Sequence, residues 1–300
     1  MKKFLFVLAF IFIAASFACA AEQSVSHIGV LTYLGTSEQE FQQGLDDLRK
    51  AVAPLIPSDN NEVDEPDMLE SFMISLVKTR RVVHFYDSLM AMQMALNSRK
   101  IYEIALPEPV GLYLVNNNNN FEILFSLNMT PSNIAFGFKR GNDKLQKEFN
   151  KAIDAMRADG TLNKLADKYI ANFAADHEEI KFSNFQGAQT IKVAVTGDLP
   201  PIDYIAPDGK PTGYNTAILA EIGKRLKKNI RLISVDAGGR SAALASERAD
   251  VVFWYRSTSG IKSKNKKVGN ALGGVMKDSL DGVILSSPYY SWDTDLIIGR

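Results

Sequence analysis

The clearest pattern of apolar and polar positions lies between Ile191 and Asp236. Residues 191–195 form a short run of β-branched and small apolar side chains, which predicts a buried strand. The Pro200-Pro201 pair ends that strand, because proline cannot donate to a sheet ladder. Asn215 is expected to cap a helix with one apolar face, and residues 231–235 predict a second strand. Ligands bind at the carboxyl ends of the strands in such β–loop–α–β units.

The chain before residue 170 shows a similar alternation. Its apolar runs predict strands separated by amphipathic helices, with the strands at 27–34, 82–85, 101–106 and 133–139. Residues 54–66 are acidic and contain prolines, which indicates a surface loop. Residues 171–190 are polar and lack periodicity, which is typical of a linker. The whole pattern predicts an α/β fold built from two similar units.

The first twenty residues have the features of a secretory signal peptide. Lys2 and Lys3 precede an apolar run that is short for a membrane span, and Ala18-Cys19-Ala20 fits a cleavage site. We therefore expect cleavage before Ala21 and a periplasmic or cell-envelope location. A lipid anchor on Cys19 is the alternative. Cys19 is the only cysteine, so the chain beyond it offers no thiol for catalysis, for a disulfide or for zinc.

The overall composition excludes several classes of function. The chain is 46% hydrophobic and its formal net charge is zero, so no excess charge favours nucleic acid or an anionic surface. Its three histidines, His27, His84 and His177, are scattered and have no partner at metal-ligand spacing. The sequence contains neither a phosphate loop nor a nucleophile elbow. We expect no metal, no cofactor and no nucleic-acid partner.

Two stretches resemble the amino-acid-type family of periplasmic solute-binding proteins. The family opens with a strand, an acidic loop with paired prolines and a Gly-aromatic-Asn/Asp helix start, which here correspond to Asp198, Pro200, Pro201, Gly213, Tyr214 and Asn215. Residues 135–170 are similar to the carboxyl-terminal segment of the family. The resemblance implies the type II two-lobed periplasmic-binding-protein-like fold, in which hinge strands join two α/β lobes.

The order of these stretches is reversed relative to the family. The family runs through its first lobe, then its second, and returns to the first, whereas its opening motif lies here in the second half of the chain. The resemblance therefore implies a circular permutation. The expected order is a signal peptide at 1–20, a second-lobe-like domain at 21–130, and a return strand and helices that pack on the first lobe at 131–170. A linker at 171–190 and a first-lobe-like domain at 191–300 follow. A coil linker of that length spans roughly 25 Å. The alternative is a piece of a tandem array, whose binding units form between repeats or in a domain-swapped dimer.

The resemblance also implies which residues bind a ligand. One wall would be lined by Asp198, Tyr204 and Tyr214. A ligand carboxylate would be received by Ser257, Ser259 and Lys262. Lys262 stands where the family has an arginine and lacks its planar fork, so Arg256 is a second candidate for the clamp.

Residues of the other lobe would complete the site. Thr36 and Ser37 would supply hydroxyl and N–H donors, although a helix cap alone also accounts for them. Glu108 would face a ligand ammonium group, and its alternative is a solvated loop carboxylate. The implied function is capture of an amino acid or related carboxylate, with the membrane permease of an ABC importer as partner.

Two other functions stay open. An enzyme on the same scaffold, such as a dehydratase of small carboxylic acids, needs a general acid or base, for which Glu108, Asp198 and Asp203 are candidates. A sensory or interaction module with a degenerate site would explain Leu199 and Ile202, which stand where the family has aromatic residues.

Overall fold

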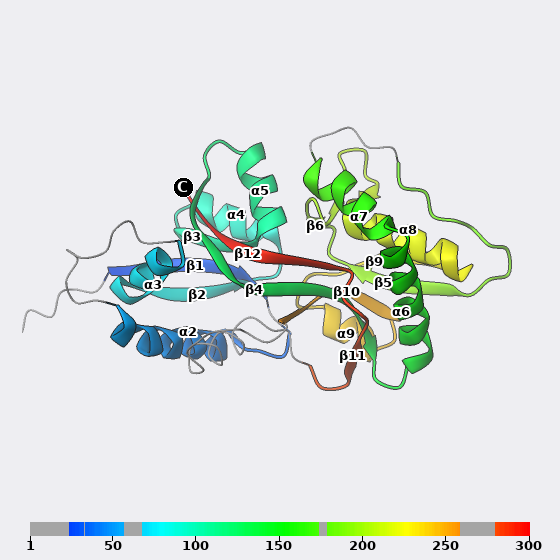
Figure 1. Cartoon of the computed structure of the whole chain (residues 1–300), viewed down its shortest axis with the longest axis horizontal. Helices are drawn as coiled ribbons and strands as arrows, with labels where there is room; N and C mark the ends of the chain where they lie inside the picture. The colour runs from blue at the N-terminus through cyan, green and yellow to red at the C-terminus, as the bar shows by residue number, and fades with distance from the viewer. Residues whose placement is uncertain (1–23, 33, 57–67, 174–178, 259–279) are drawn as a thin grey trace, which may run out of the picture.

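The computed structural model of the chain describes residues 24–32, 34–56, 68–173, 179–258 and 280–300. In this part of the chain, two α/β lobes lie side by side and share one mixed sheet (Figure 1). We call residues 24–121 the amino-terminal lobe, and residues 140–258 and 280–289 the carboxyl-terminal lobe. Among the described residues, no helix combines the length and the apolar character needed to cross a bilayer.

Nine of the described strands form the shared sheet, in the spatial order β2-β1-β3-β12-β4-β10-β5-β9, with β11 paired to β4. Their bounds are β1 (Ser24–Leu31), β2 (Thr79–Tyr86), β3 (Glu103–Pro107), β4 (Glu122–Lys139), β5 (Thr190–Val195), β9 (Asn229–Ser234), β10 (Val251–Thr258), β11 (Val283–Leu285) and β12 (Tyr290–Gly299). The outer strands of each lobe are parallel, whereas β4 and β12 pair antiparallel to their neighbours.

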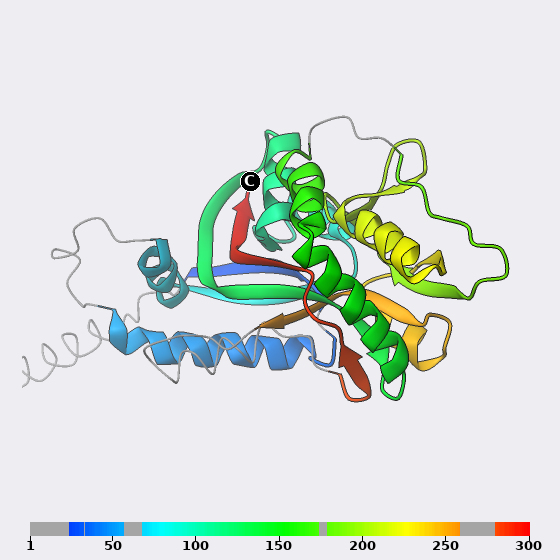
Figure 2. The ribbon, with the colours of Figure 1, turned by 45° about the vertical axis from the view of Figure 1, so that its right-hand side comes forward.

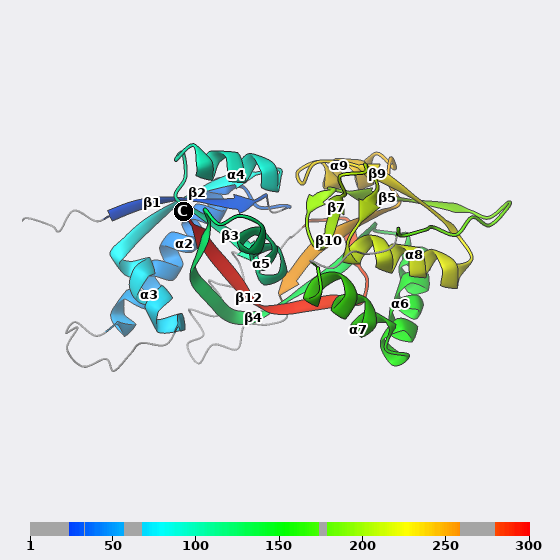
Figure 3. The same cartoon turned by 90° about the horizontal axis from the view of Figure 1, so that it is seen from above.

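Helices cover both faces of the sheet in each lobe (Figure 3). The amino-terminal lobe carries α2 (Glu38–Val52), α3 (Met68–Lys78), α4 (Leu89–Asn97) and α5 (Glu108–Asn117), with a short 3-10 turn at Ala53–Leu55. The carboxyl-terminal lobe carries α6 (Asp143–Ala158), α7 (Thr161–Ala166), a π-helical turn at Asp167–Ala171, α8 (Tyr214–Leu226) and α9 (Arg240–Ala245). A small antiparallel sheet of β6 (Asp198–Leu199), β7 (Asp203–Ile205) and β8 (Pro211–Thr212) lies between β5 and α8 in the chain.

The strands β4 and β12 join the two lobes. They pair antiparallel from Tyr290–Ile134 to Gly299–Glu122, and the end of β12 also pairs with β3. Figure 2 shows β4 as one long, curved strand with β12 beside it. The pairing is irregular between Trp292 and Thr294, where the register skips residues of β4. The chain therefore crosses between the lobes once on β4 and returns on β12.

The apolar pattern of β1 explains how the amino-terminal lobe packs. Ile28 and Val30 lie in a cluster under α2 and α3, because alternate side chains of a strand point to opposite faces. Gly29 points to the α4 side, where an added Cβ would lie 2.8 Å from Met92. A residue without a side chain at this position lets α4 lie close against the sheet.

Three sequence-based expectations were wrong in detail. The alternative reading of Glu108 as a loop carboxylate does not hold, since α5 begins at Glu108 and proline is tolerated in the first turn of a helix. Asn215 does not cap α8; the cap residue is Gly213, and the Asn215 side chain bonds Tyr289. The polar segment 171–190 is not a free tether, since Ile180 and Phe182 pack against the main core and Phe185 N–H donates to Asn229 Oδ1.

Candidate functional site

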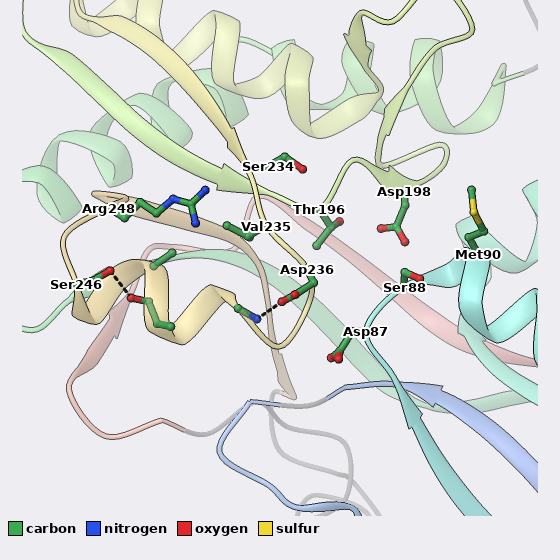
Figure 4. A pocket seen from close by; sticks show the side chains of 13 residues that line it. Asp87, Ser88, Met90, Thr196, Asp198, Ser234, Val235, Asp236, Ser246 and Arg248 are labelled. Carbon is green, nitrogen blue, oxygen red and sulfur yellow. Dashed lines mark hydrogen bonds between the residues drawn. The ribbon is translucent and has the colours of Figure 1, made fainter.

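A cavity of about 620 Å³ lies between the lobes. The carboxyl-terminal lobe contributes residues that follow the ends of β5 and β9, together with α9 and the turn after it. The amino-terminal lobe contributes the start of α4. The lining consists of Asp87, Ser88, Met90, Thr196, Asp198, Ser234, Val235, Asp236, Gly239, Ala242, Ala243, Ser246 and Arg248 (Figure 4). This is the position at which ligands bind in open α/β sheets.

Three carboxylates from both lobes line this cavity. Asp198 Oδ2 accepts a hydrogen bond from the backbone N–H of Leu89 at 2.8 Å, across the two lobes. Asp87 Oδ1 accepts from the Thr32 hydroxyl at 2.9 Å, and Asp236 Oδ1 accepts from the Gly239 N–H. Burial raises the pKa of Asp198, and the hydrogen bond from Leu89 opposes that rise. These bonds hold the carboxylates in place beside the cavity.

Arg248 is the only cation among the lining residues that belong to the described part of the chain. Its side chain is exposed, and it forms no ion pair with any residue in the described ranges. Figure 4 shows Arg248 on the opposite side of the cavity from Asp198, with Asp236 between them. The cavity is therefore acidic on the side next to α4 and basic at the turn after α9.

The two lobes touch beside the cavity through direct contacts. Ala237 N–H donates to the backbone oxygen of Asp87 at 3.1 Å. The buried Arg240 guanidinium donates to Ala237 O at 2.9 Å and to Thr32 O at 3.5 Å. Leu34 packs among residues of β5 and α9. The structure is thus a closed arrangement of the lobes.

Of the residues expected to bind a ligand, Asp198 lines the cavity, and Thr36 and Ser37 lie in the loop that carries Leu34 to the other lobe. Ser37 caps α2: its hydroxyl accepts from Glu40 N–H at 3.2 Å, and the Glu40 carboxylate accepts from Ser37 N–H at 2.8 Å. The Ser37 hydroxyl is therefore already used within its own lobe. Thr36 is half-buried.

Glu108 and Arg256 lie in a second group of charged side chains, next to the hinge strand β12. Arg256 is 6% exposed, donates to Asp295 Oδ2 at 3.4 Å and lies over the Trp292 ring. Trp292 Nε1–H donates to the other oxygen of Asp295 at 2.9 Å. Burial raises the pKa of Glu108, and the nearby Asp293 and Asp295 raise it further. None of these residues lines the interlobe cavity.

Tyr204 and Tyr214, which were expected to line one wall of the site, lie in different surroundings. Tyr204 is half-buried, and its ring centre lies 6.1 Å from that of Tyr113, which belongs to α5 of the other lobe. Tyr214 is fully buried at the start of α8, and its hydroxyl donates to Tyr289 O at 3.0 Å. Neither lines the cavity in this closed arrangement. Their assignment as one wall of a binding site stays a prediction.

The remaining expected ligand residues cannot be placed as side chains. The backbone of Ser257 pairs with Asn133 at the end of β10. Ser259 and Lys262 lie outside the described residues. The predicted carboxylate clamp at these three positions therefore stays a prediction.

Asp203, a candidate for acid–base chemistry, is a buried carboxylate that is hydrogen-bonded within its own loop. It is 1% exposed, and its Oδ2 accepts from Gly197 N–H at 2.7 Å and from the Thr196 hydroxyl at 3.3 Å. Burial raises its pKa to about 7, and the nearby Asp198 adds to the rise. Asp203 does not line the cavity, so it supports the loop that presents Asp198. The described residues include no group of three or more His, Cys, Asp or Glu side chains placed to hold a metal ion.

Sequence reasoning missed Asp87, Asp236 and Arg248 as lining residues. Asp87 and Asp236 follow the predicted strands 82–85 and 231–235, so the rule that ligands bind at the carboxyl ends of strands was a signal for both. Arg248 lies in a polar turn between α9 and β10, and no pattern distinguishes it from other surface arginines.

Two α/β lobes that are joined by two strands and have a cavity with charged lining residues between them define the class of two-lobed binding proteins. The model of the bacterial extracellular solute-binding proteins, family 3, matches residues 22–172 and 191–265. These segments make up more than half of the chain, and the protein belongs to this family. No protein with curated annotation matches the chain.

Several solved structures are similar in outline. The ligand-binding component of an ABC-type import system from Staphylococcus aureus, with zinc bound, is 12% identical, with 93% of this chain and 66% of that chain covered and a TM-score of 0.40. NikA from Staphylococcus aureus in complex with Ni(L-His)2 is 12% identical, and the match covers 73% of this chain and 57% of NikA with a TM-score of 0.40. A nutrient-binding protein from Burkholderia cenocepacia bound to methionine is 12% identical, with 92% and 84% covered and a TM-score of 0.36. The chain thus spans less than two thirds of the first two, and likeness at this level supports no argument about the ligand.

Proposed function

We propose that the protein captures a small polar solute outside the cytoplasmic membrane and delivers it to the permease of an ABC importer. The solute is an amino acid or a related carboxylate. The single observation that carries this proposal is the cavity of about 620 Å³ between the lobes, lined by charged groups of both signs. A volume of this size accommodates a small solute, and a few charged hydrogen bonds inside it fix the orientation of the solute.

Several observations favour this function over the alternatives. The family is one of solute-binding proteins. A sensory module with a filled cleft does not fit a cavity of about 620 Å³ whose described lining includes four charged side chains. A dehydratase-like enzyme needs its acid and base at one site, whereas Asp198 lines the cavity and Asp203 and Glu108 do not.

The test starts from protein purified without refolding. Mass spectrometry of the denatured sample identifies any co-purified solute, and calorimetry against a panel of amino acids, amines and small carboxylates measures binding. We expect at least one amino acid to bind with a micromolar or tighter dissociation constant. Failure of every member of the panel to bind, with no co-purified solute, would refute the proposal.

We also propose that the lobe order is circularly permuted relative to the family. Support comes from the path of the chain: β12 ends in the amino-terminal lobe, where it pairs with β3, and β3 is the neighbour of β1. A short connection from the end of β12 to the start of β1 would therefore restore the family order. A gene encoding residues 179–300, a flexible linker and residues 24–173 keeps the packed residues Ile180 and Phe182 and should yield a folded monomer with the same ligand. A domain-swapped dimer in light scattering, or loss of folding in the reordered chain, would contradict this proposal.

A further inference from the structure

We infer that the interlobe cavity selects a basic amino acid, whose carboxylate binds Arg248 and whose cationic groups bind Asp87, Asp198 and Asp236. The inference rests on the proposed function, and it names the charge class and the orientation of the solute. It also assigns the solute carboxylate to Arg248, whereas the resemblance to the family implies Lys262 or Arg256.

The charge of the lining favours a cationic solute. Among the described residues, the lining contains three carboxylates and one guanidinium, which together carry a formal charge of −2. A neutral zwitterion leaves that imbalance unchanged, and an anionic solute increases it. A solute with one net positive charge reduces it, and the gain is larger inside a partly closed cavity than in bulk water because the effective dielectric constant is lower.

The carboxylates are held ready to accept hydrogen bonds from ammonium or guanidinium groups. Asp198 and Asp236 are each anchored by a backbone N–H, and Asp87 by the Thr32 hydroxyl. A carboxylate has two oxygens and about four acceptor positions, so these local bonds leave capacity for a solute, although less at Asp198, which also accepts from Thr196 and from its own backbone. Asp87 comes from the amino-terminal lobe and the other two from the carboxyl-terminal lobe, so a cationic group between them contacts both lobes.

Arg248 is positioned to receive the other end of the solute. Its side chain is exposed, it is the one cation that the described residues contribute to the lining, and it lies across the cavity from Asp198 (Figure 4). Its planar guanidinium suits a bidentate bond to a carboxylate. Apolar side chains also line the cavity, namely Met90, Val235, Ala242 and Ala243, and they suit the methylene stem of a basic amino acid.

The experiment compares matched solutes by calorimetry on the full protein. The panel pairs L-lysine with its uncharged-tail counterpart L-norleucine, and L-arginine with L-citrulline. Cadaverine and agmatine serve as the corresponding amines without a carboxylate. We expect lysine or arginine to bind at least about tenfold more tightly than its neutral counterpart, which is the ratio given by one charge-assisted hydrogen bond.

Variants separate the two ends of the site. Arg248→Gln should weaken binding of the amino acid at least about tenfold and leave binding of the matching amine unchanged. Asp236→Asn should weaken both. Arg231→Gln is the control, because Arg231 is an exposed arginine of β9 in the same lobe and is not part of the cavity lining.

The outcomes distinguish this inference from the proposed function. Equal affinity for the charged and neutral solutes, or unchanged amino-acid affinity in Arg248→Gln, would overturn the inference and leave solute capture standing. Absence of binding to all amino acids, amines and carboxylates would refute solute capture itself, and the inference with it.

Discussion

Replacing Asp203 with asparagine tests how strongly a buried carboxylate lowers stability at neutral pH. Asp203 is 1% exposed, and its bonds from Gly197 N–H and the Thr196 hydroxyl do not compensate for its burial, which raises its pKa from 3.8 to about 7. The folded protein therefore binds this proton more tightly than the unfolded chain does. The resulting stabilisation is fully present below about pH 4 and is lost as the pH rises through 7.

The size of the effect follows from the two pKa values. Because one pKa unit corresponds to about 1.4 kcal/mol, the interval from 3.8 to about 7 amounts to about 4 kcal/mol. Asparagine keeps an oxygen that accepts from Gly197 N–H and carries no charge. We therefore expect Asp203→Asn to gain about 4 kcal/mol relative to the natural protein between pH 4 and pH 8.

The assay is urea unfolding followed by circular dichroism at intervals from pH 4 to pH 8. The difference in unfolding free energy between the two proteins reports Asp203 together with its electrostatic coupling to Asp198, because the more distant titrating groups contribute equally to both. Asp281→Asn, at an exposed position of the same lobe, is the control and should show a constant difference. A constant difference for Asp203→Asn across this range would refute the reasoning.

Three further substitutions test the fold and the closed arrangement. Gly213→Ala should lower the free energy of unfolding by about 2 kcal/mol or more, because φ is +99° and the new Cβ would lie 2.7 Å from a backbone oxygen of Ile202; urea unfolding measures this loss. Glu103→Ala should cost about 3–5 kcal/mol in the same assay, because it removes the carboxylate that pairs with the buried Arg81 at 2.6 Å. Asp198→Asn should shift the ligand-free protein toward a more open form, because it weakens the hydrogen bond from the Leu89 N–H across the lobes. Small-angle X-ray scattering measures the radius of gyration, and an unchanged value would contradict this prediction.

Much of the fold was predictable because periodicity reports burial directly. The predicted strands around Ile28 and from Ile191 are both present. The start of α5 at Glu108 was missed because prolines on both sides of it suggested a break. The hinge strand β4 was predicted only from residue 133, although its first half is also rich in apolar residues, namely Ile123, Leu124, Phe125 and Leu127.

The candidate site was less predictable, because its residues come together only in three dimensions. Asp198 was found from its motif, whereas Asp87 and Arg248 are far apart in sequence and lie in unremarkable polar segments. Arg256 was read as a ligand clamp, but no one-dimensional pattern could indicate that Asp295, thirty-nine positions later, would hold its guanidinium. Ser37 shows the same limit, since its anion-binding and helix-capping roles use identical residue types.

The irregular pairing between Trp292 and Thr294 has a mechanical consequence. Because β4 and β12 are the neighbouring strands that run through both lobes, any separation of the lobes has to bend or twist both of them together. The strain of that motion concentrates where the ladder between them is interrupted. Amide hydrogens of residues 292–294 should therefore exchange at a rate that depends on whether a solute is bound, while those of residues 295–297, where the pairing is continuous, stay protected.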